Sequence, residues 1–221
     1  MIDDGIDSSE NNIIYGDECD NLLKEALDAE NEQVALQKFF EVISLYPNCD
    51  YAYYQIGLYY KEYGCYKDAV KYLSKAVELQ PENDNAFAEL GYCYEVLGKL
   101  KKAENCYQMA LNLNPDNPTT MYYWADYLIN KKKDFHNAEV VAKELVFQYP
   151  EVAIAHRLYA DVLSELDKTQ DANEEYRKAV ELAPEDCIIL NNYGVFLLNN
   201  GEADFAKKYL KQAIEINPSE K

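Results

Sequence analysis

The residue types that most often carry catalysis or bind metal ions are few and scattered in this chain. Its two histidines, His136 and His156, are 20 residues apart, and neither has a cysteine or carboxylate at metal-ligand spacing. The sequence contains no GxSxG motif, no phosphate-binding glycine loop and no HExxH motif. We therefore expect a protein that is not an enzyme and that uses no metal ion or other cofactor.

The cysteines do not follow a metal-binding or disulfide pattern either. No two of them form a CxxC pair, and small secreted disulfide-rich domains have a denser arrangement. The six are Cys19, Cys49, Cys65, Cys93, Cys106 and Cys187. Their spacing favours reduced thiols and a cytoplasmic location.

Tyrosine is abundant, with 21 tyrosines in 221 residues, and its side chain can both stack and form hydrogen bonds. Exposed aromatic side chains that gather in a patch are typical of protein-binding surfaces. Whether the tyrosines line a surface or fill a core depends on the elements that carry them.

The net charge of the chain indicates which classes of partner it can bind. The chain has 40 acidic and 21 basic side chains, for a formal net charge of −19. Binding to nucleic acid or to an anionic membrane relies on clustered lysine and arginine, so we expect neither. No apolar run approaches the ~20 residues that span a bilayer, and the N-terminus is acidic where a secretory signal would be basic. The composition favours basic partners.

A repeat of about 34 residues organises the chain. Six of the seven prolines follow it, with gaps of 34, 34, 35, 34 and 34 residues: Pro47, Pro81, Pro115, Pro150, Pro184 and Pro218. Six of the eight glycines fall at two positions of the same repeat, the eighth (Gly57, Gly91, Gly194) and the fifteenth (Gly64, Gly98, Gly201). Such a period is the sequence signature of a helical solenoid.

Each repeat reads as two short amphipathic helices joined by a turn. Small residues at positions 8, 20 and 27 would let the helices approach, and large residues at positions 4, 7, 11 and 24 would fill the space between them. We predict repeats at 16–49, 50–83, 84–117, 118–152, 153–186 and 187–220, after an acidic and largely disordered segment at 1–15. Repeat four is one residue longer than the others, and we place the extra residue in its turn, NKKKDFHNA.

This arrangement resembles the tetratricopeptide repeat family, whose motif is a helix pair of 34 residues. The match covers residues 16–221 and departs from the family pattern at Leu23, where a small residue is usual, and at Ala142, where a large one is usual. The resemblance implies an all-α fold, an α-solenoid wound into a right-handed superhelix of six helix pairs. The stretch LNNYGVFLLNNG at 190–201 is also similar to repeats of type IV pilus assembly proteins.

In this family the first helices line a concave groove that commonly holds an extended peptide or a partner's helix. Positions of the first helices that point away from the packing stripe would face that groove. They are Tyr51, Tyr54, Leu58, Glu89, Tyr92, Tyr122, Tyr123, Asp126, Arg157, Asp161, Asn191, Asn192 and Val195. The alternative for the tyrosines is ordinary packing between adjacent first helices.

The predicted groove is aromatic, rich in amides and mostly acidic, which indicates a protein or peptide partner with basic and apolar residues. Members of the family that bind chaperones use a Lys/Asn/Lys/Arg clamp for a C-terminal carboxylate. The corresponding positions here include Tyr54, Leu58, Asn85, Glu89 and Tyr123, so that clamp is missing.

On this basis we expect a protein–protein interaction scaffold. The alternative is a structural subunit that self-associates in a larger assembly, for example a pilus or secretion assembly. Leu210, Ile214 and Ile216 would form an open apolar C-terminal edge for that purpose.

Overall fold

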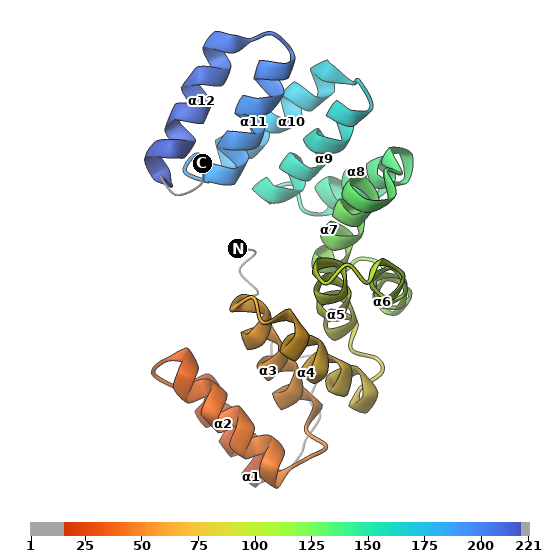
Figure 1. The fold of residues 1–221 in the computed structure, drawn as a ribbon, viewed down its shortest axis with the longest axis vertical. Coiled ribbons are helices and arrows are strands. Elements are labelled where there is room, and N and C mark those ends of the chain that lie inside the picture. The colour runs from red at the N-terminus through yellow and green to blue at the C-terminus, as the bar shows by residue number, and fades with distance from the viewer. Residues whose placement is uncertain (1–15, 218–221) are drawn as a thin grey trace. The chain divides into compact units, whose positions relative to one another are not determined.

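The computed structural model describes residues 16–217, and within that range every regular element is a helix (Figure 1). The first helices of the repeats are α1 (Asp17–Leu27), α3 (Asp50–Glu62), α5 (Asp84–Val96), α7 (Pro118–Tyr127), α9 (Ala153–Glu165) and α11 (Cys187–Asn199). The second helices are α2 (Glu32–Leu45), α4 (Tyr66–Leu79), α6 (Leu100–Leu113), α8 (Phe135–Gln148), α10 (Thr169–Leu182) and α12 (Ala203–Ile216). The predicted all-α solenoid of six helix pairs is confirmed. The segment predicted to be disordered, 1–15, lies outside the described residues.

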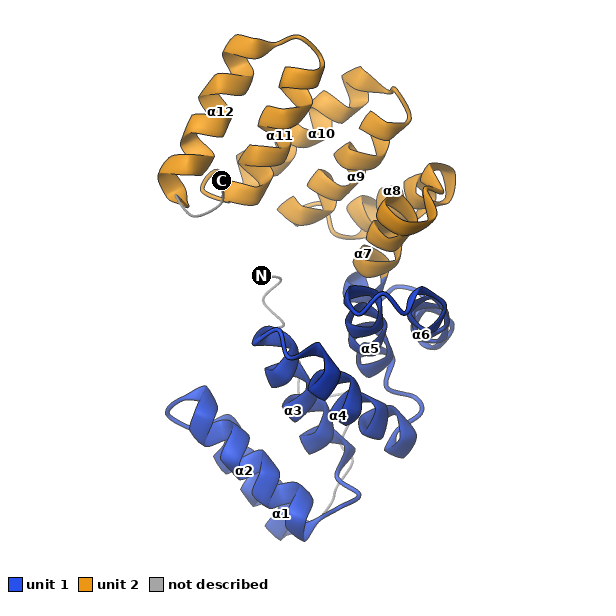
Figure 2. Cartoon of the chain, viewed as in Figure 1, with its two compact units in different colours: residues 1–120 blue, residues 121–221 orange. Residues whose placement is uncertain are grey.

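The chain forms two compact units, which are coloured separately in Figure 2. Unit 1 is Met1–Thr120 and unit 2 is Met121–Lys221, so the boundary falls inside α7. Unit 1 contains the helix pairs α1–α2, α3–α4 and α5–α6, and unit 2 contains α9–α10, α11–α12 and most of repeat four.

The fifteenth position of the repeat ends the first helix with a left-handed backbone, as the glycines there predict. Gly64, Gly98 and Gly201 have φ angles of 69°, 71° and 82°. Lys133 and Asp167 hold the same place in repeats four and five with φ angles of 56° and 58°. The turn therefore keeps one backbone conformation in five repeats, although only three of them have glycine.

The extra residue of repeat four enters the structure as a π-helical turn. The element η1 (Leu128–Lys132) directly follows α7, and Lys133 closes it through its amide, which donates to the carbonyl of Leu128. We predicted the extra residue in the turn that begins at Asn130, so the insertion begins two residues earlier than expected. His136, which we also assigned to that turn, lies exposed in the first turn of α8.

In several repeats the residue two positions after the repeat proline caps the N-terminus of the next helix with its side chain. Asn83 Oδ1 accepts a hydrogen bond from the amide of Ala86 (2.9 Å), and Asn117 Oδ1 accepts one from Thr120 (3.0 Å). Asp186 Oδ1 caps α11 in the same way. These contacts satisfy amide groups that a helix leaves unpaired at its N-terminus.

The two helices of a repeat pack most closely where position 8 meets position 24. A Cβ atom added to Gly57 or Gly194 would lie 2.6 Å from Cγ of Leu73 or Leu210, respectively. A Cβ on Gly91 would lie 2.7 Å from Cε1 of Tyr107. The next nearest side chain to that position is Cys106, whose own Cβ would lie 3.3 Å away.

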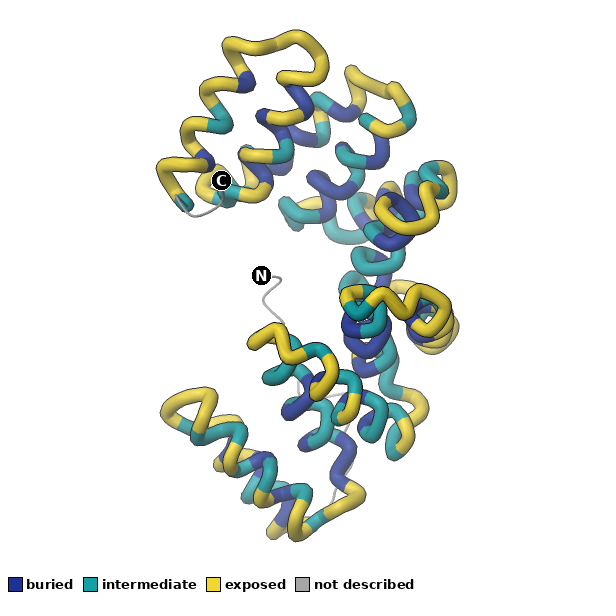
Figure 3. The backbone as a smooth tube through the Cα atoms, in the orientation of Figure 1, coloured by how far each residue is buried: buried dark blue, intermediate teal, exposed yellow. Residues whose placement is uncertain are grey.

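Within each unit, neighbouring repeats share clusters of buried residues, and the buried stretches of the backbone are dark blue in Figure 3. In unit 1, Leu73 of repeat two packs in one cluster with Leu90 and Cys93 of repeat three. In unit 2, the Tyr176 ring lies 5.4 Å from that of Tyr193 and 5.0 Å from that of Phe196, measured between ring centroids. Position 24 therefore serves two interfaces, one within its repeat and one with the next.

His156 links three segments of unit 2. Its Nδ1 lies 2.5 Å from Glu175 Oε2 on α10, and its Nε2 lies 2.9 Å from the carbonyl oxygen of Pro150. The hydrogen bond to Glu175 raises the pKa of His156 above its ordinary value, against the opposing effect of burial. Burial alone would raise the pKa of Glu175, but hydrogen bonds from His156 and Lys178 outweigh it and lower the pKa. Both shifts favour an imidazolium paired with a carboxylate.

We expect Gly91→Ala to destabilise unit 1 by about 1–3 kcal/mol, because the new methyl group would overlap a ring that a hydrogen bond from Tyr107 to Glu95 (2.9 Å) holds in place. The measurement is chemical denaturation of four proteins: wild type, Gly91→Ala, Tyr107→Ala and the double variant. Removing the ring should abolish most of the cost of the methyl group. Additive effects of the two substitutions would contradict this packing.

The ion pair of His156 predicts a pH dependence of stability. A raised histidine pKa contributes stability that is present below the pKa of the unfolded chain and is lost as pH rises through the folded pKa. The lowered pKa of Glu175 contributes stability that is lost as pH falls through that value. The difference in unfolding free energy between wild type and Glu175→Gln should therefore be largest at mildly acidic pH and shrink toward pH 9. Glu174→Gln, an exposed neighbour on α10, is the matched control and should give a flat difference.

Candidate partner-binding surface

A buried arginine connects the first helices of unit 2. The Nη2 atom of Arg157, on α9, donates to the hydroxyl of Tyr122 on α7 (2.7 Å), and Nη1 donates to Asp161 Oδ2 one turn along α9 (2.5 Å). With its amide oxygen turned toward α9, Asn192 on α11 accepts from the same Nη1 at 3.2 Å. Three successive first helices of the unit thus contact one guanidinium group.

The carboxylate of Asp161 is occupied on both oxygens. Its second oxygen, Oδ1, accepts a short hydrogen bond from the hydroxyl of Tyr176 on α10. Burial raises the pKa of Asp161, and Arg157 and Tyr176 oppose that rise. Burial and the adjacent Asp161 raise the pKa of the Tyr176 hydroxyl, so the hydroxyl stays protonated and acts as the donor.

Arg157 is buried, with only 7% of the residue exposed, yet its environment keeps the guanidinium charged. Burial would lower its pKa, but Asp161, Tyr122 and Asp126 outweigh that effect and raise it. Asp126, on α7, is half-buried and accepts a hydrogen bond from Asn130 at 3.0 Å. One arginine with two nearby carboxylates leaves this group of side chains with a formal charge of −1.

The remaining predicted residues of unit 2 lie beside this network. The ring of Tyr123 is half-buried and meets that of Tyr122 edge-on, with centroids 5.9 Å apart. Asn191 and Val195 of α11 are exposed. We call the set Tyr122, Tyr123, Asp126, Arg157, Asp161, Asn191, Asn192 and Val195 the unit 2 surface. It offers an aromatic ring, an amide, an apolar side chain and carboxylates held in place by hydrogen bonds.

The predicted residues of unit 1 are more engaged in packing. Glu89 is 7% exposed and forms an ion pair with Lys61 (2.8 Å), which joins α5 to α3. Tyr51 packs against the buried cluster of repeat one and the start of repeat two, and Tyr54 packs against the cluster that repeats two and three share. The rings of Tyr92 and Tyr66, on α4, have centroids 6.2 Å apart. Burial and Tyr66 raise the pKa of Tyr92 to about 12. Leu58 is half-buried. These contacts fit the packing alternative for the tyrosines.

Sequence reasoning missed two residues that complete these sites. Tyr176 stands at position 24, where the sequence predicts a large residue that fills the space between helices, yet its hydroxyl also reaches Asp161. Lys61 was not singled out, although it neutralises Glu89. A buried carboxylate needs a partner, but nothing in the sequence marks Glu89 as buried, so the sequence carries no signal for Lys61.

Two features are absent from the residues that the structure describes. None of the helices in 16–217 combines the length and hydropathy that crossing a bilayer requires. Within the same residues, no three histidine, cysteine or acidic side chains are grouped so that they could hold a metal ion.

Comparison with known families identifies the repeats. Residues 50–83 and 85–117 each match the tetratricopeptide repeat, and residues 154–220 match YpiA-like, C-terminal tetratricopeptide repeats. Together these matches cover more than half of the chain. Among curated proteins, Protein arginine N-methyltransferase 9 of Xenopus laevis is 38% identical over 74 residues, which are 34% of this chain and 8% of that protein. The chain thus spans a small part of that relative.

Solved structures show the same fold. A chain of the APC/C hetero-tetramer Cut9-Hcn1 has a TM-score of 0.81 at 16% identity, over 91% of this chain and 41% of that one. PilW, a type IV pilus biogenesis factor, has a TM-score of 0.72 at 16% identity, over 78% of this chain and 79% of that one. At these identities both likenesses show the fold alone. The repeat matches show that the chain belongs to the tetratricopeptide repeat family.

Proposed function

We propose that this protein is a scaffold for protein–protein interaction and that unit 2 binds a peptide or helix of its partner along the unit 2 surface. Tetratricopeptide repeat proteins generally act as such scaffolds, and their repeats are typically not enzymes. We also propose the cytoplasm as its location, which its scattered cysteines favour. The observation that carries the binding site is the Arg157 network, which fixes polar groups of three successive first helices in one place.

The network supports binding because its geometry is set before a ligand arrives. Tyr122, Asp161 and Asn192 all contact Arg157, so a ligand need not order them at its own expense. Asn191 and Val195 are exposed beside the network, and an amide can pair with both donors and acceptors of an extended backbone.

Charge indicates the chemistry of the partner. The network carries a formal charge of −1 within a chain of net charge −19. A ligand with lysine or arginine would be steered to the surface by this field, and an apolar side chain of the ligand could contact Tyr123 and Val195. We therefore propose a partner segment that combines basic and apolar residues.

The charge preference is tested by panning a library of displayed random peptides with the whole protein. We expect enrichment of lysine and arginine, and binding of a selected peptide, followed by fluorescence anisotropy, that weakens about tenfold with Asp126→Lys. Asp171→Lys makes the same charge change at an exposed site on α10 and should alter the affinity by less than about twofold. Peptides without a basic excess, or equal effects of the two variants, would overturn the proposed ligand chemistry.

The aromatic anchor is tested with the same selected peptide. At a micromolar affinity, near −8 kcal/mol, Tyr123→Ala should cost about 1–2 kcal/mol, or roughly tenfold. Lys132→Ala, in η1, should leave the affinity unchanged, because this side chain is not part of the unit 2 surface. Normal binding by Tyr123→Ala together with loss of binding by Lys132→Ala would place the binding site on the opposite face of the repeats.

A further inference from the structure

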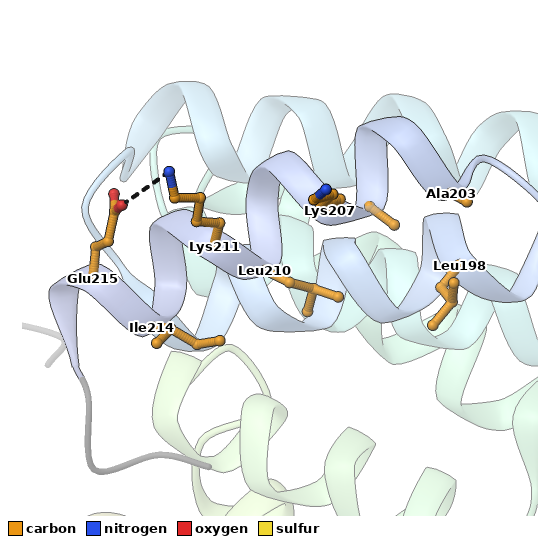
Figure 4. Close-up of a pocket in the computed structure, with 8 residues that line it drawn as sticks. Leu198, Ala203, Lys207, Leu210, Lys211, Ile214 and Glu215 are labelled. Carbon is orange, nitrogen blue, oxygen red and sulfur yellow. Dashed lines mark ion pairs between the residues drawn. The ribbon is translucent and has the colours of Figure 1, made fainter.

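The outer face of the last described repeat has an apolar hollow. It is an open space of about 500 Å³ lined by Leu198, Ala203, Ala206, Lys207, Leu210, Lys211, Ile214 and Glu215, and we call it the α12 face (Figure 4). Leu198 is 53% exposed and Ile214 49%, while Leu210 is partly covered. Of the C-terminal edge that the sequence predicted, Leu210 and Ile214 line this hollow, and Ile216 lies exposed at the end of α12. Leu198 of α11 also lines it.

The equivalent surface of repeat five shows what kind of contact this face can make. The residues 34 positions before Leu210 and Ile214 are Tyr176 and Val180 of repeat five. In repeat five, α11 covers them, and Tyr176 packs against Tyr193 and Phe196. The α12 face thus repeats a surface that elsewhere in unit 2 is buried under an apolar helix.

A second copy of the chain could bring either of its ends to this face, and charge excludes one of them. In α1, the residues equivalent to Ile189 and Phe196 of α11 are Glu18 and Glu25. Both glutamates are exposed, and Glu25 is paired with Lys38 at 2.7 Å. Stacking in the register of the repeats would press these carboxylates onto Ile214 and Leu210, which costs free energy because the charges would lose water.

The α12 face is instead complementary to itself. Its rim carries Lys207 in the first half of α12, Lys211 near the middle and Glu215 near the end, and Lys211 lies 3.5 Å from Glu215 in the same helix. If two copies of α12 cross antiparallel at Lys211, then Lys207 and Glu215 each lie about 6 Å along the axis from the crossing, on opposite sides. Each Lys207 then faces the partner's Glu215. The two Lys211 side chains stand near the two-fold axis, each beside the Glu215 of its own helix, and the apolar side chains of both faces meet alongside.

We propose that two copies of this chain associate through their α12 faces as a two-fold symmetric dimer. A two-fold contact closes on itself, so association stops at two copies. The dimer buries Leu198, Leu210 and Ile214 of both chains and forms two equivalent ion pairs between Lys207 and Glu215. It leaves the unit 2 surface for another partner, because that proposed binding site consists of different residues.

The first test is the mass of the 221-residue protein by sedimentation velocity from about 1 to 200 µM. We expect a monomer–dimer equilibrium that saturates at the dimer, and Ile214→Glu should weaken it at least about tenfold. Phe147→Glu is the matched control, since Phe147 is 80% exposed on α8 and outside the α12 face. A monomer at all concentrations, growth beyond the dimer, or an equal effect of the control would overturn the proposal.

The second test addresses symmetry and does not depend on an apolar substitution. Lys207→Glu and Glu215→Lys should each weaken the dimer by about threefold to tenfold, because each places two pairs of like charges across the contact. The double variant restores both pairs and should return the dissociation constant to within about twofold of wild type. Circular dichroism melting of each variant checks that the fold is kept. Single variants with wild-type affinity, or a double variant as weak as the single ones, would show that the contact lacks this two-fold pairing.

Discussion

The close approach of the two helices within each repeat is the constraint on which the structure depends. At Gly57, Gly91 and Gly194 the opposing side chain occupies the space that a Cβ atom would need. That side chain, at position 24, also contacts the next repeat, as Tyr176 does with Tyr193 and Phe196. The distance between two helices of one pair therefore sets where the next pair packs, and stability in such an array passes from neighbour to neighbour.

Most of the fold could be predicted because its determinants are local and recur. Proline and glycine positions give the period, and an apolar pattern repeated in register identifies the helix pairs more securely than any single window would. The exceptions are local as well. The start of the inserted turn could not be placed because an extra residue in a helix can shift to the position that costs least, here a π-helical turn at Leu128–Lys132.

The candidate surface could be predicted less completely, because side-chain partners depend on distances that the repeat alone does not give. Position in the repeat brought Tyr122, Arg157, Asp161 and Asn192 into one set, and the structure brings the same four together. The pattern could not show that Arg157 is buried or that Tyr176 reaches Asp161. Nor could it show that Tyr51, Tyr54 and Tyr92 of unit 1 pack against neighbouring residues, since groove-facing and packed tyrosines can occupy the same positions of a first helix.

The π-helical turn of repeat four has a practical consequence for work with this protein. The turn absorbs one additional residue, while α8 keeps the 14-residue length of the other second helices and α9 begins at its usual distance from α8. Lys131, Lys132 and Lys133 are exposed there. A connection that already accepts a change of length is a suitable place to insert a short epitope or a labelling cysteine, because the flanking helices need not move. A fluorophore at this connection would report on unit 2 without replacing any residue of the unit 2 surface or the α12 face.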